Sequence, residues 1–461
     1  MTSAAAQGVS RKQRSSNEQS TPDEHRFSGD RGPANDLAAD RAELRAAAAE
    51  HAELLRTLGP VRGRGDTESA RATESHRAIR VLRRRFLRAH VDEVYRAATD
   101  NLTARPRLSE LAAAATALFP GLLPEPAAFA AETGVAQAEK EGWEIDQGIF
   151  FHAVFGDAVA GNHLLDSMRA PTARARQFRA QYEATGSVTL PAVALTRSGD
   201  TATLTITNGH CLNAEDNQHV ADMETAVDLV LLDPASRVGV VRGGIMDHRN
   251  YRGRRVFSAG INLAHLHEGK ISFVDFILGR EAGYIAKILR GLPAPDDDAT
   301  ALPTTKPWIA AVDAFAIGGG AQLLLVFDRV IAAADSYFSL PAAQEGIVPG
   351  AANLRLGRAT DHRLSREVIL WGSRIQATDP GARLVFDTVV EPDAMDEEIA
   401  RAAERLAAPA VVANKHMLVS GEEPQDVFRR YLSEFALHQA GRFYGTDVLT
   451  KVSRFTAGAG R

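Results

Sequence analysis

Two glycine-containing turns restrict the fold of this chain more than any other feature of its sequence. The first lies within 257–263 and the second within 316–322, where an apolar strand is expected to turn into an apolar helix. Glycine lets a ligand approach the backbone closely, and a helix start leaves N–H groups unpaired where the dipole favours negative charge. Two such turns that face each other can supply two donors to one developing oxyanion. Such a preorganised donor is typically worth about 3 kcal/mol of transition-state stabilisation.

Strands alternate with helices in the second half of the chain. The predicted strands are Val193–Arg197, Thr201–Thr207, Val238–Val241, Trp308–Ile317 and Val330–Ala333. The predicted helices are Gln218–Leu232, Phe273–Leu289, Ala321–Phe327 and further helices from Ala333 to the C-terminus. Such alternation is typical of βαβ units with right-handed crossovers, so we expect an α/β fold.

The rest of the chain divides by composition. We predict a disordered tail over residues 1–35, because that stretch is polar and has no hydrophobic period. Ala-rich and amphipathic segments predict a helical N-terminal domain over 36–185. The α/β core is expected over 186–395, and a C-terminal helical region over 396–461.

Bulk properties exclude several classes of function. The net charge of −5 argues against nucleic acid as the main partner. The basic run Arg83–Arg85 is interpreted as a solvated helix face rather than as a phosphate-binding patch. A single cysteine, Cys211, permits no internal disulfide. No secretory h-region and no apolar stretch of membrane-spanning length is apparent, so we expect a cytoplasmic protein with no membrane partner.

Two other ligand classes fit the sequence poorly. A dinucleotide turn beginning at Gly318 would need Gly or Ala at position 323, where Leu323 stands. His265 and His267 suggest metal ligands, but histidines two apart on a helix diverge. The sequence therefore predicts no metal.

Four segments resemble the crotonase (enoyl-CoA hydratase/isomerase) superfamily. They are the two glycine turns, Lys306–Val312 and Phe338–Gly350, and they occur in the family's order. The resemblance covers roughly residues 190–395. It implies a crotonase (ClpP-like) ββα-superhelix core, an acyl-CoA substrate and assembly into a homotrimer or homohexamer. It also implies that Ile261 and Gly319 donate their N–H groups to the thioester carbonyl.

The sequence departs from the hydratases of that family at two positions. Gln322 and Ala342 stand where those enzymes carry the glutamates that hold and activate water. An amide cannot accept a proton near neutral pH, and a methyl group can neither donate nor accept one. Hydration therefore lacks its acid and base.

These departures and the long N-terminal extension resemble a subgroup of cofactor-independent oxygenases from glycopeptide-antibiotic pathways. That resemblance implies conversion of 3,5-dihydroxyphenylacetyl-CoA and O2 to 3,5-dihydroxyphenylglyoxylate and free CoA, with no metal or flavin. The implied course is α-deprotonation, oxidation of the enolate by O2, a peroxide at the α-carbon, and attack on the thioester that expels CoA. The implied substrate contacts are Glu215, Arg280, Gln322, Ala259, Gly260, Gly320 and Ile347.

Two alternatives remain open. One is another crotonase activity on an acyl-CoA, namely thioester hydrolysis, isomerisation or decarboxylation. The other is a non-catalytic acyl-CoA-binding protein. The paired glycine turns argue against the second, because a scaffold needs no oxyanion donors.

Overall fold

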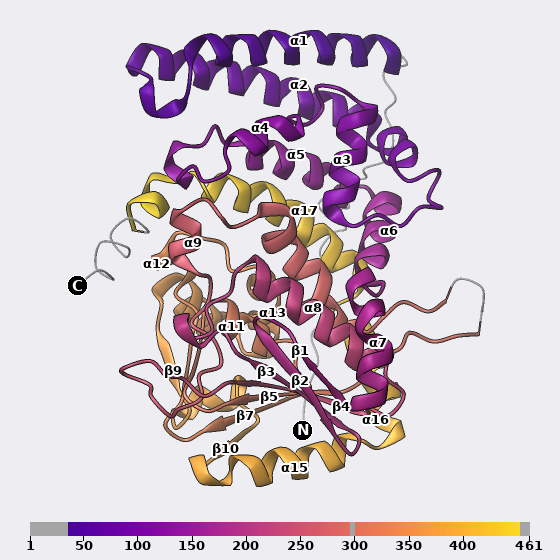
Figure 1. The fold of residues 1–461 in the computed structure, drawn as a ribbon, viewed down its shortest axis with the longest axis vertical. Helices are drawn as coiled ribbons and strands as arrows, with labels where there is room; N and C mark the ends of the chain where they lie inside the picture. The colour runs from indigo at the N-terminus through magenta and orange to yellow at the C-terminus, as the bar shows by residue number, and fades with distance from the viewer. Residues whose placement is uncertain (1–35, 296–299, 452–461) are drawn as a thin grey trace, which may run out of the picture. The chain divides into compact units, whose positions relative to one another are not determined.

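The computed structural model describes residues 36–295 and 300–451 (Figure 1). The predicted disordered tail lies outside these residues, as does the end of the predicted C-terminal helical region. Among the described helices, none is long and apolar enough to cross a membrane.

From residue 36, where the described part of the chain begins, to the first strand, the regular elements are helices. Helix α5 is their centre: it packs against α2 and α17, and its run of buried aromatic residues includes Phe150, Phe151 and Phe155. The helices of this region are α1 (Leu37–Leu58), α2 (Asp66–Ala98), α3 (Leu108–Leu118), α4 (Pro126–Ala131), α5 (Trp143–Gly156), α6 (Ala158–Arg169) and α7 (Ala173–Thr185).

A seven-stranded sheet with the strand order β1-β2-β3-β4-β5-β7-β10 forms the base of the core. Strands β2 and β3 pair antiparallel around a turn at Gly199, and the pairs from β3 to β10 are parallel. Residues of β3 alternate between half-buried and buried, as its threonine pattern predicts. The strands are β1 (Ser187–Thr189), β2 (Val193–Ser198), β3 (Thr201–Ile206), β4 (Val238–Gly243), β5 (Trp308–Val312), β7 (Arg329–Ala333) and β10 (Thr388–Val390).

A second sheet, with the order β6-β8-β9, departs from the sequence-based expectation. The stretch predicted as one strand from Trp308 to Ile317 is two strands, because the chain leaves the large sheet at Asp313, whose carboxylate binds Arg242 at 2.5 Å. The helices expected after Ala333 are interrupted by short strands that are too brief to give a periodic signal. The strands of the second sheet are β6 (Phe315–Ile317), β8 (Tyr337–Ser339) and β9 (Arg374–Gln376).

Helices cover both faces of the large sheet (Figure 1). Helix α15 packs on one face through Met395 and Ala402, and α8 packs on the other through Val227. The predicted helix that starts at Phe273 is present, but most of it consists of π-helical turns (Phe273–Leu278, Glu281–Ile285). The core helices are α8 (Asn217–Leu232), α9 (Leu263–His267), α10 (Ala286–Arg290), α11 (Gly319–Leu324), α12 (Ala342–Glu345), α13 (Ala352–Ala359), α14 (His362–Arg366), α15 (Met395–Leu406), α16 (Pro409–Glu422) and α17 (Gln425–Arg442).

The interpretation of Arg83–Arg85 as a solvated face is wrong for Arg83. That side chain is buried and donates to the Asp146 carboxylate at 2.6 Å and to the carbonyl oxygen of Gly121 at 2.9 Å. Burial alone would raise the pKa of Asp146, but Arg83 and Arg80 outweigh it and lower that pKa. A buried charge needs such partners, and the partner comes from α5, which the local sequence of α2 does not reveal.

We predict that Asp146→Ala lowers the free energy of unfolding by about 3–5 kcal/mol, because it leaves two guanidinium groups without a carboxylate in the interior. Urea denaturation followed by circular dichroism measures the loss. Glu74→Ala is the matched control: its ion pair with Arg77 is exposed, so its removal should leave the free energy of unfolding close to that of the wild type. Equal losses in the two variants would contradict the role given to Asp146.

Candidate active site

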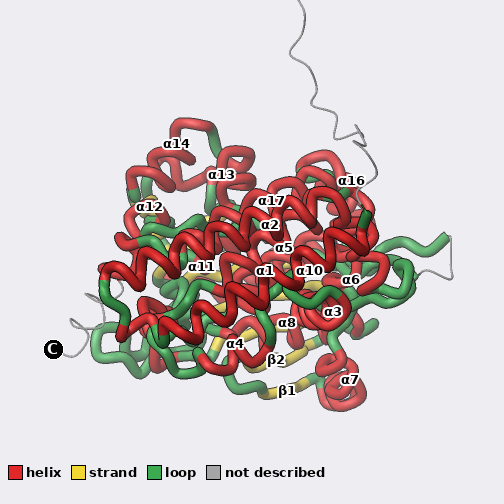
Figure 2. Tube along the Cα trace, turned by 90° about the horizontal axis from the view of Figure 1, so that it is seen from above, coloured by secondary structure: helices red, strands yellow, loops and turns green. Residues whose placement is uncertain are grey.

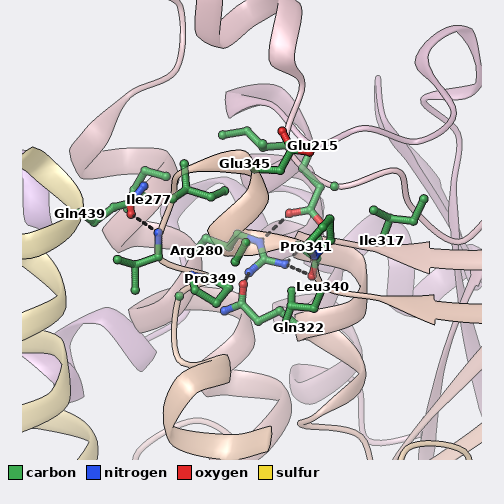
Figure 3. Close-up of a pocket in the computed structure, with 18 of the residues that line it drawn as sticks. Glu215, Ile277, Arg280, Ile317, Gln322, Leu340, Pro341, Glu345, Pro349 and Gln439 are labelled. Carbon is green, nitrogen blue, oxygen red and sulfur yellow. Dashed lines mark hydrogen bonds and ion pairs between the residues drawn. The ribbon is translucent and has the colours of Figure 1, made fainter. Parts of the chain in front are cut away.

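The two glycine turns meet at a cavity of about 140 Å³ (Figure 3). Its walls are mostly apolar and come from the turns, the π-helical segment, α11, α12 and α17. The lining residues that the sequence predicts for the site are Glu215, Ala259, Gly260, Ile261, Arg280, Gly319, Gln322 and Ile347.

Backbone hydrogen bonds hold the two turns against each other. The N–H of Ile317 donates to the carbonyl oxygen of Ser258 at 2.9 Å, and Glu215 forms a parallel bridge with Ile261. A Cβ atom built on Gly260 would lie 3.1 Å from the oxygen of Ile317 and 3.4 Å from the nitrogen of Gly319. Because Gly260 also has a φ of +86°, only glycine suits this close approach.

The main-chain N–H groups of Ile261 and Gly319 are free at this contact. Across the described parts of the chain, neither N–H has a hydrogen-bond acceptor, and both residues are half-buried in the pocket wall. Gly319 is the first residue of α11, where helical N–H groups have no partner within the helix. Two unpaired donors from adjacent turns therefore border one cavity, as an oxyanion site requires.

Arg280 connects the polar residues of the cavity (Figure 3). Its Nε donates to the Glu215 carboxylate at 2.6 Å, and its Nη1 donates to Gln322 Oε1 at 2.9 Å. Further bonds run from Nη1 to Glu281 at 3.2 Å, from Nη2 to Glu215 at 3.3 Å and from Nη2 to the oxygen of Gly319 at 2.6 Å. All five guanidinium N–H groups are thus engaged by the protein.

The charged neighbours in this cluster, together with burial, shift the pKa values of Arg280 and Tyr284. Burial alone would lower the pKa of Arg280, but the neighbouring Glu215, Tyr284 and Glu281 raise it above its usual range. Burial raises the pKa of Tyr284, which therefore stays a neutral phenol. Arg280 is therefore a cation at neutral pH.

One predicted site residue lies outside the cavity lining. Gly320 is buried behind the wall, where an added Cβ would lie 2.5 Å from the Cβ of Ser258. It permits α11 to pack against the first turn. Ala342, where the family resemblance implies a glutamate in hydratases, lines the cavity and leaves that position apolar.

Several lining residues were not predicted from the sequence. Glu281 is buried, accepts the N–H of Ala351 at 3.2 Å and bonds the Gln322 amide. Gln439 comes from α17 and accepts the N–H of Val348 at 2.8 Å. Glu281 follows Arg280 directly, which is a signal that sequence analysis could have used, whereas the position of Gln439 depends on tertiary packing alone. The other such residues include Glu345, Leu340, Pro341, Val348, Pro349 and Phe435.

His265 and His267 both lie on the short helix α9, and His265 Nδ1 is 3.3 Å from an Asp216 carboxylate oxygen. Within the described residues, no group of three or more His, Cys, Asp or Glu side chains could hold a metal ion.

Comparison with known proteins assigns this fold and site to a family. The family model described as enoyl-CoA hydratase/isomerase matches residues 197–430. The chain belongs to the enoyl-CoA hydratase/isomerase, or crotonase, family and has that family's core fold, to which the N-terminal helices are added.

A full-length relative lies within that family. The chain is 53% identical over 420 residues to a (3,5-dihydroxyphenyl)acetyl-CoA 1,2-dioxygenase of Amycolatopsis orientalis. The matched region covers 91% of this chain and 96% of that protein. It is 31% identical over 223 residues to a carnitinyl-CoA dehydratase of Citrobacter koseri, covering 47% of this chain and 77% of that protein. The solved structure of Pseudomonas aeruginosa OdaA matches with 23% identity and a TM-score of 0.48, over 57% of this chain and 98% of that one.

Adding a methyl group at Gly319 tests how tightly the turn and the ion pair are packed. A Cβ there would lie 2.7 Å and 2.9 Å from the two carboxylate oxygens of Glu215, so Gly319→Ala must displace that carboxylate from Arg280. We predict a loss of about 1–3 kcal/mol in the free energy of unfolding, measured by denaturant titration.

Gly421→Ala in α16 is the control, because nothing lies within 4 Å of the added Cβ. That change should leave stability equal or raise it by up to about 1 kcal/mol. A Gly319→Ala protein as stable as the wild type would mean that the turn and the Glu215 carboxylate are not packed as described.

Proposed function

We propose that this protein is a cofactor-independent dioxygenase that converts 3,5-dihydroxyphenylacetyl-CoA and O2 to 3,5-dihydroxyphenylglyoxylate and free CoA. The observation that carries this proposal is the pair of unpaired N–H groups of Ile261 and Gly319 at one cavity. The full-length similarity to a (3,5-dihydroxyphenyl)acetyl-CoA 1,2-dioxygenase supports the choice of substrate. A role in glycopeptide-antibiotic precursor synthesis agrees with that choice.

In this proposal the two N–H groups bind the thioester carbonyl oxygen. As the α-carbon loses a proton, negative charge collects on that oxygen, and fixed donors stabilise it without reorganisation. Gln322 and Ala342 supply neither the acid nor the base needed to add water. An apolar wall that includes Ile277 and Phe435 leaves the enolate open to O2 instead.

The oxygen atoms balance without an added reductant. The enolate carbon gives its electrons to O2 and forms a C–O bond, which yields a peroxide at the α-carbon. The distal peroxide oxygen attacks the thioester carbonyl, and the C–S bond breaks to release CoA thiolate. Loss of the second α-proton as the O–O bond breaks leaves a 2-oxo acid that holds both oxygen atoms.

The polar end of the cavity suits the two phenol groups of this substrate. Glu215 presents a carboxylate acceptor and Gln322 presents a side-chain amide, next to an otherwise apolar wall. Because all five donors of Arg280 are engaged, we assign Arg280 chiefly to holding Glu215 and Gln322. Its direct contact with a phenol stays a prediction. Assembly into a trimer or hexamer and a cytoplasmic location likewise stay predictions.

Oxygen consumption is the direct test of this function. In EDTA, the purified protein should consume one O2 for each thiol released from 3,5-dihydroxyphenylacetyl-CoA, as followed with an oxygen electrode and a thiol reagent. Thiol release that is unchanged under nitrogen would instead indicate a thioester hydrolase. Turnover that EDTA abolishes would contradict the absence of a metal.

Substrate specificity tests the role of Glu215. We predict that Glu215→Gln lowers kcat/KM for the dihydroxyphenyl thioester about 10- to 100-fold more than for phenylacetyl-CoA, because only the former needs a phenol acceptor. Glu345→Gln is the matched control, since Glu345 lines the same cavity but is assigned no phenol. It should change both thioesters equally, and an equal effect in Glu215→Gln would remove Glu215 from the phenol site.

A further inference from the structure

The cavity between the glycine turns contains few groups that can accept a proton. In the described part of the chain, its lining includes three carboxylates, those of Glu215, Glu281 and Glu345, and no histidine, lysine, cysteine or tyrosine. The amide and guanidinium side chains of the lining cannot take up a proton near neutral pH. A lining side chain that removes an α-proton is therefore one of these three carboxylates.

Two of the three carboxylates are held by a buried cation. Glu215 is buried and accepts a hydrogen bond from Arg280 at 2.6 Å. Glu281 is also buried, lies 3.2 Å from Arg280 and accepts the N–H of Ala351 at 3.2 Å. Protonation of either carboxylate would remove charge that compensates a guanidinium group in the interior. Neither is therefore placed to accept a proton during turnover.

Glu345 differs from both in its surroundings. Across the residues that the structure describes, its carboxylate has no ion pair and no hydrogen bond, and no dashed line reaches it in Figure 3. The residue is half-buried, and neither of its oxygens is among the enclosed side-chain atoms that lack a partner. Both oxygens therefore have accessible surface and are open to a ligand or to water.

Local helix geometry directs Glu345 toward the cavity. Helix α12 is a single turn, and Ala342 and Glu345 lie three positions apart on one of its faces. Ala342 lines the cavity and is buried. Because side chains in a helix lean toward its N-terminus, Glu345 is directed back over the turn of Ala342, where a methyl group leaves space.

Helix α12 holds Glu345 between the cavity and the periphery of the molecule. Gly346 ends the helix with a φ of +78°, and its carbonyl oxygen accepts from Arg442 of α17. Arg442 pairs with Asp447. On its other side, α12 packs against the π-helical turn Glu367–Trp371, and Figure 2 shows α12 and α14 at the same edge of the molecule. A proton taken up by Glu345 can therefore pass to solvent.

We propose that Glu345 is the base that removes the α-proton of the bound thioester. This assignment rests on the proposed function, in which the N–H groups of Ile261 and Gly319 hold the carbonyl oxygen. The Cα–H bond breaks, the proton passes to a carboxylate oxygen of Glu345, and the electron pair moves to that carbonyl oxygen. The step needs no oxidant, and Glu345 is restored when it releases the proton to water.

Hydrogen exchange without oxygen isolates this step. The full chain is incubated under nitrogen in D2O with 3,5-dihydroxyphenylacetyl-CoA, and proton NMR follows the loss of the α-hydrogen signal. Wild-type protein should replace both α-hydrogens with deuterium. We expect Glu345→Gln to lower the exchange rate about 100-fold or more, the usual contribution of a positioned general base. The loss should be equal for phenylacetyl-CoA, because both thioesters carry the same α-hydrogens.

Two further measurements separate a catalytic role from a structural one. Glu345→Gln keeps the size of the side chain and breaks no ion pair, so its melting temperature should equal that of the wild type. Its affinity for the thioester, measured by calorimetry under nitrogen, should also be unchanged. Glu404→Gln is the matched control: Glu404 is exposed on α15 and is not among the cavity-lining residues, so exchange should proceed at the wild-type rate.

Exchange by Glu345→Gln at the wild-type rate, or no exchange by the wild type, would overturn the assignment. Its failure can be told apart from failure of the proposed function, because exchange does not require O2. Glu345-dependent exchange in a protein that consumes no O2 would keep the base and refute the dioxygenase. O2 uptake by the wild type with undiminished exchange in Glu345→Gln would refute the base and keep the dioxygenase.

Discussion

The site depends on one buried cation, Arg280. Its guanidinium group binds Glu215, Glu281, Gln322 and the carbonyl oxygen of Gly319, so it connects the segment before α8, the π-helical segment and the start of α11. A charge in the interior is tolerated only when it is fully paired. The arrangement of these partners is therefore fixed, and with it the direction of the turn that carries the Gly319 N–H.

Buried ion pairs continue beyond the cavity. Arg355 Nη1 lies 3.8 Å from a carboxylate oxygen of Glu281. The Glu423 carboxylate binds both Arg355 and Arg290. Acids and bases thus alternate through the interior. On the other side, α17 supplies Phe435 and Gln439 to the pocket and packs on α5. The N-terminal helices therefore support a helix that forms part of the wall.

The position of the two glycine turns could be predicted from the sequence because each turn depends on a few adjacent residues. A turn that needs a positive φ at Gly260, or a helix start at Gly319, can be recognised from a few adjacent residues. The burial of Arg83 could not, because its partner Asp146 lies 63 positions away. Gln439 was missed for the same reason. Gly320, a predicted substrate contact, is not among the cavity-lining residues and packs closely against Ser258, a placement that its position in the same turn does not reveal.

The lack of glutamates at positions 322 and 342 bears on the reaction because the N–H donors of Ile261 and Gly319 are still present at the cavity. In the proposed reaction, the N–H groups of Ile261 and Gly319 stabilise an enolate, whereas Gln322 and Ala342 cannot supply the acid and base that would deliver water. The most direct measurement is a crystal structure with a non-hydrolysable thioester analogue bound. The account predicts the carbonyl oxygen within about 2.7–3.1 Å of both the Ile261 and Gly319 nitrogens. An analogue whose carbonyl oxygen contacts neither nitrogen would contradict it.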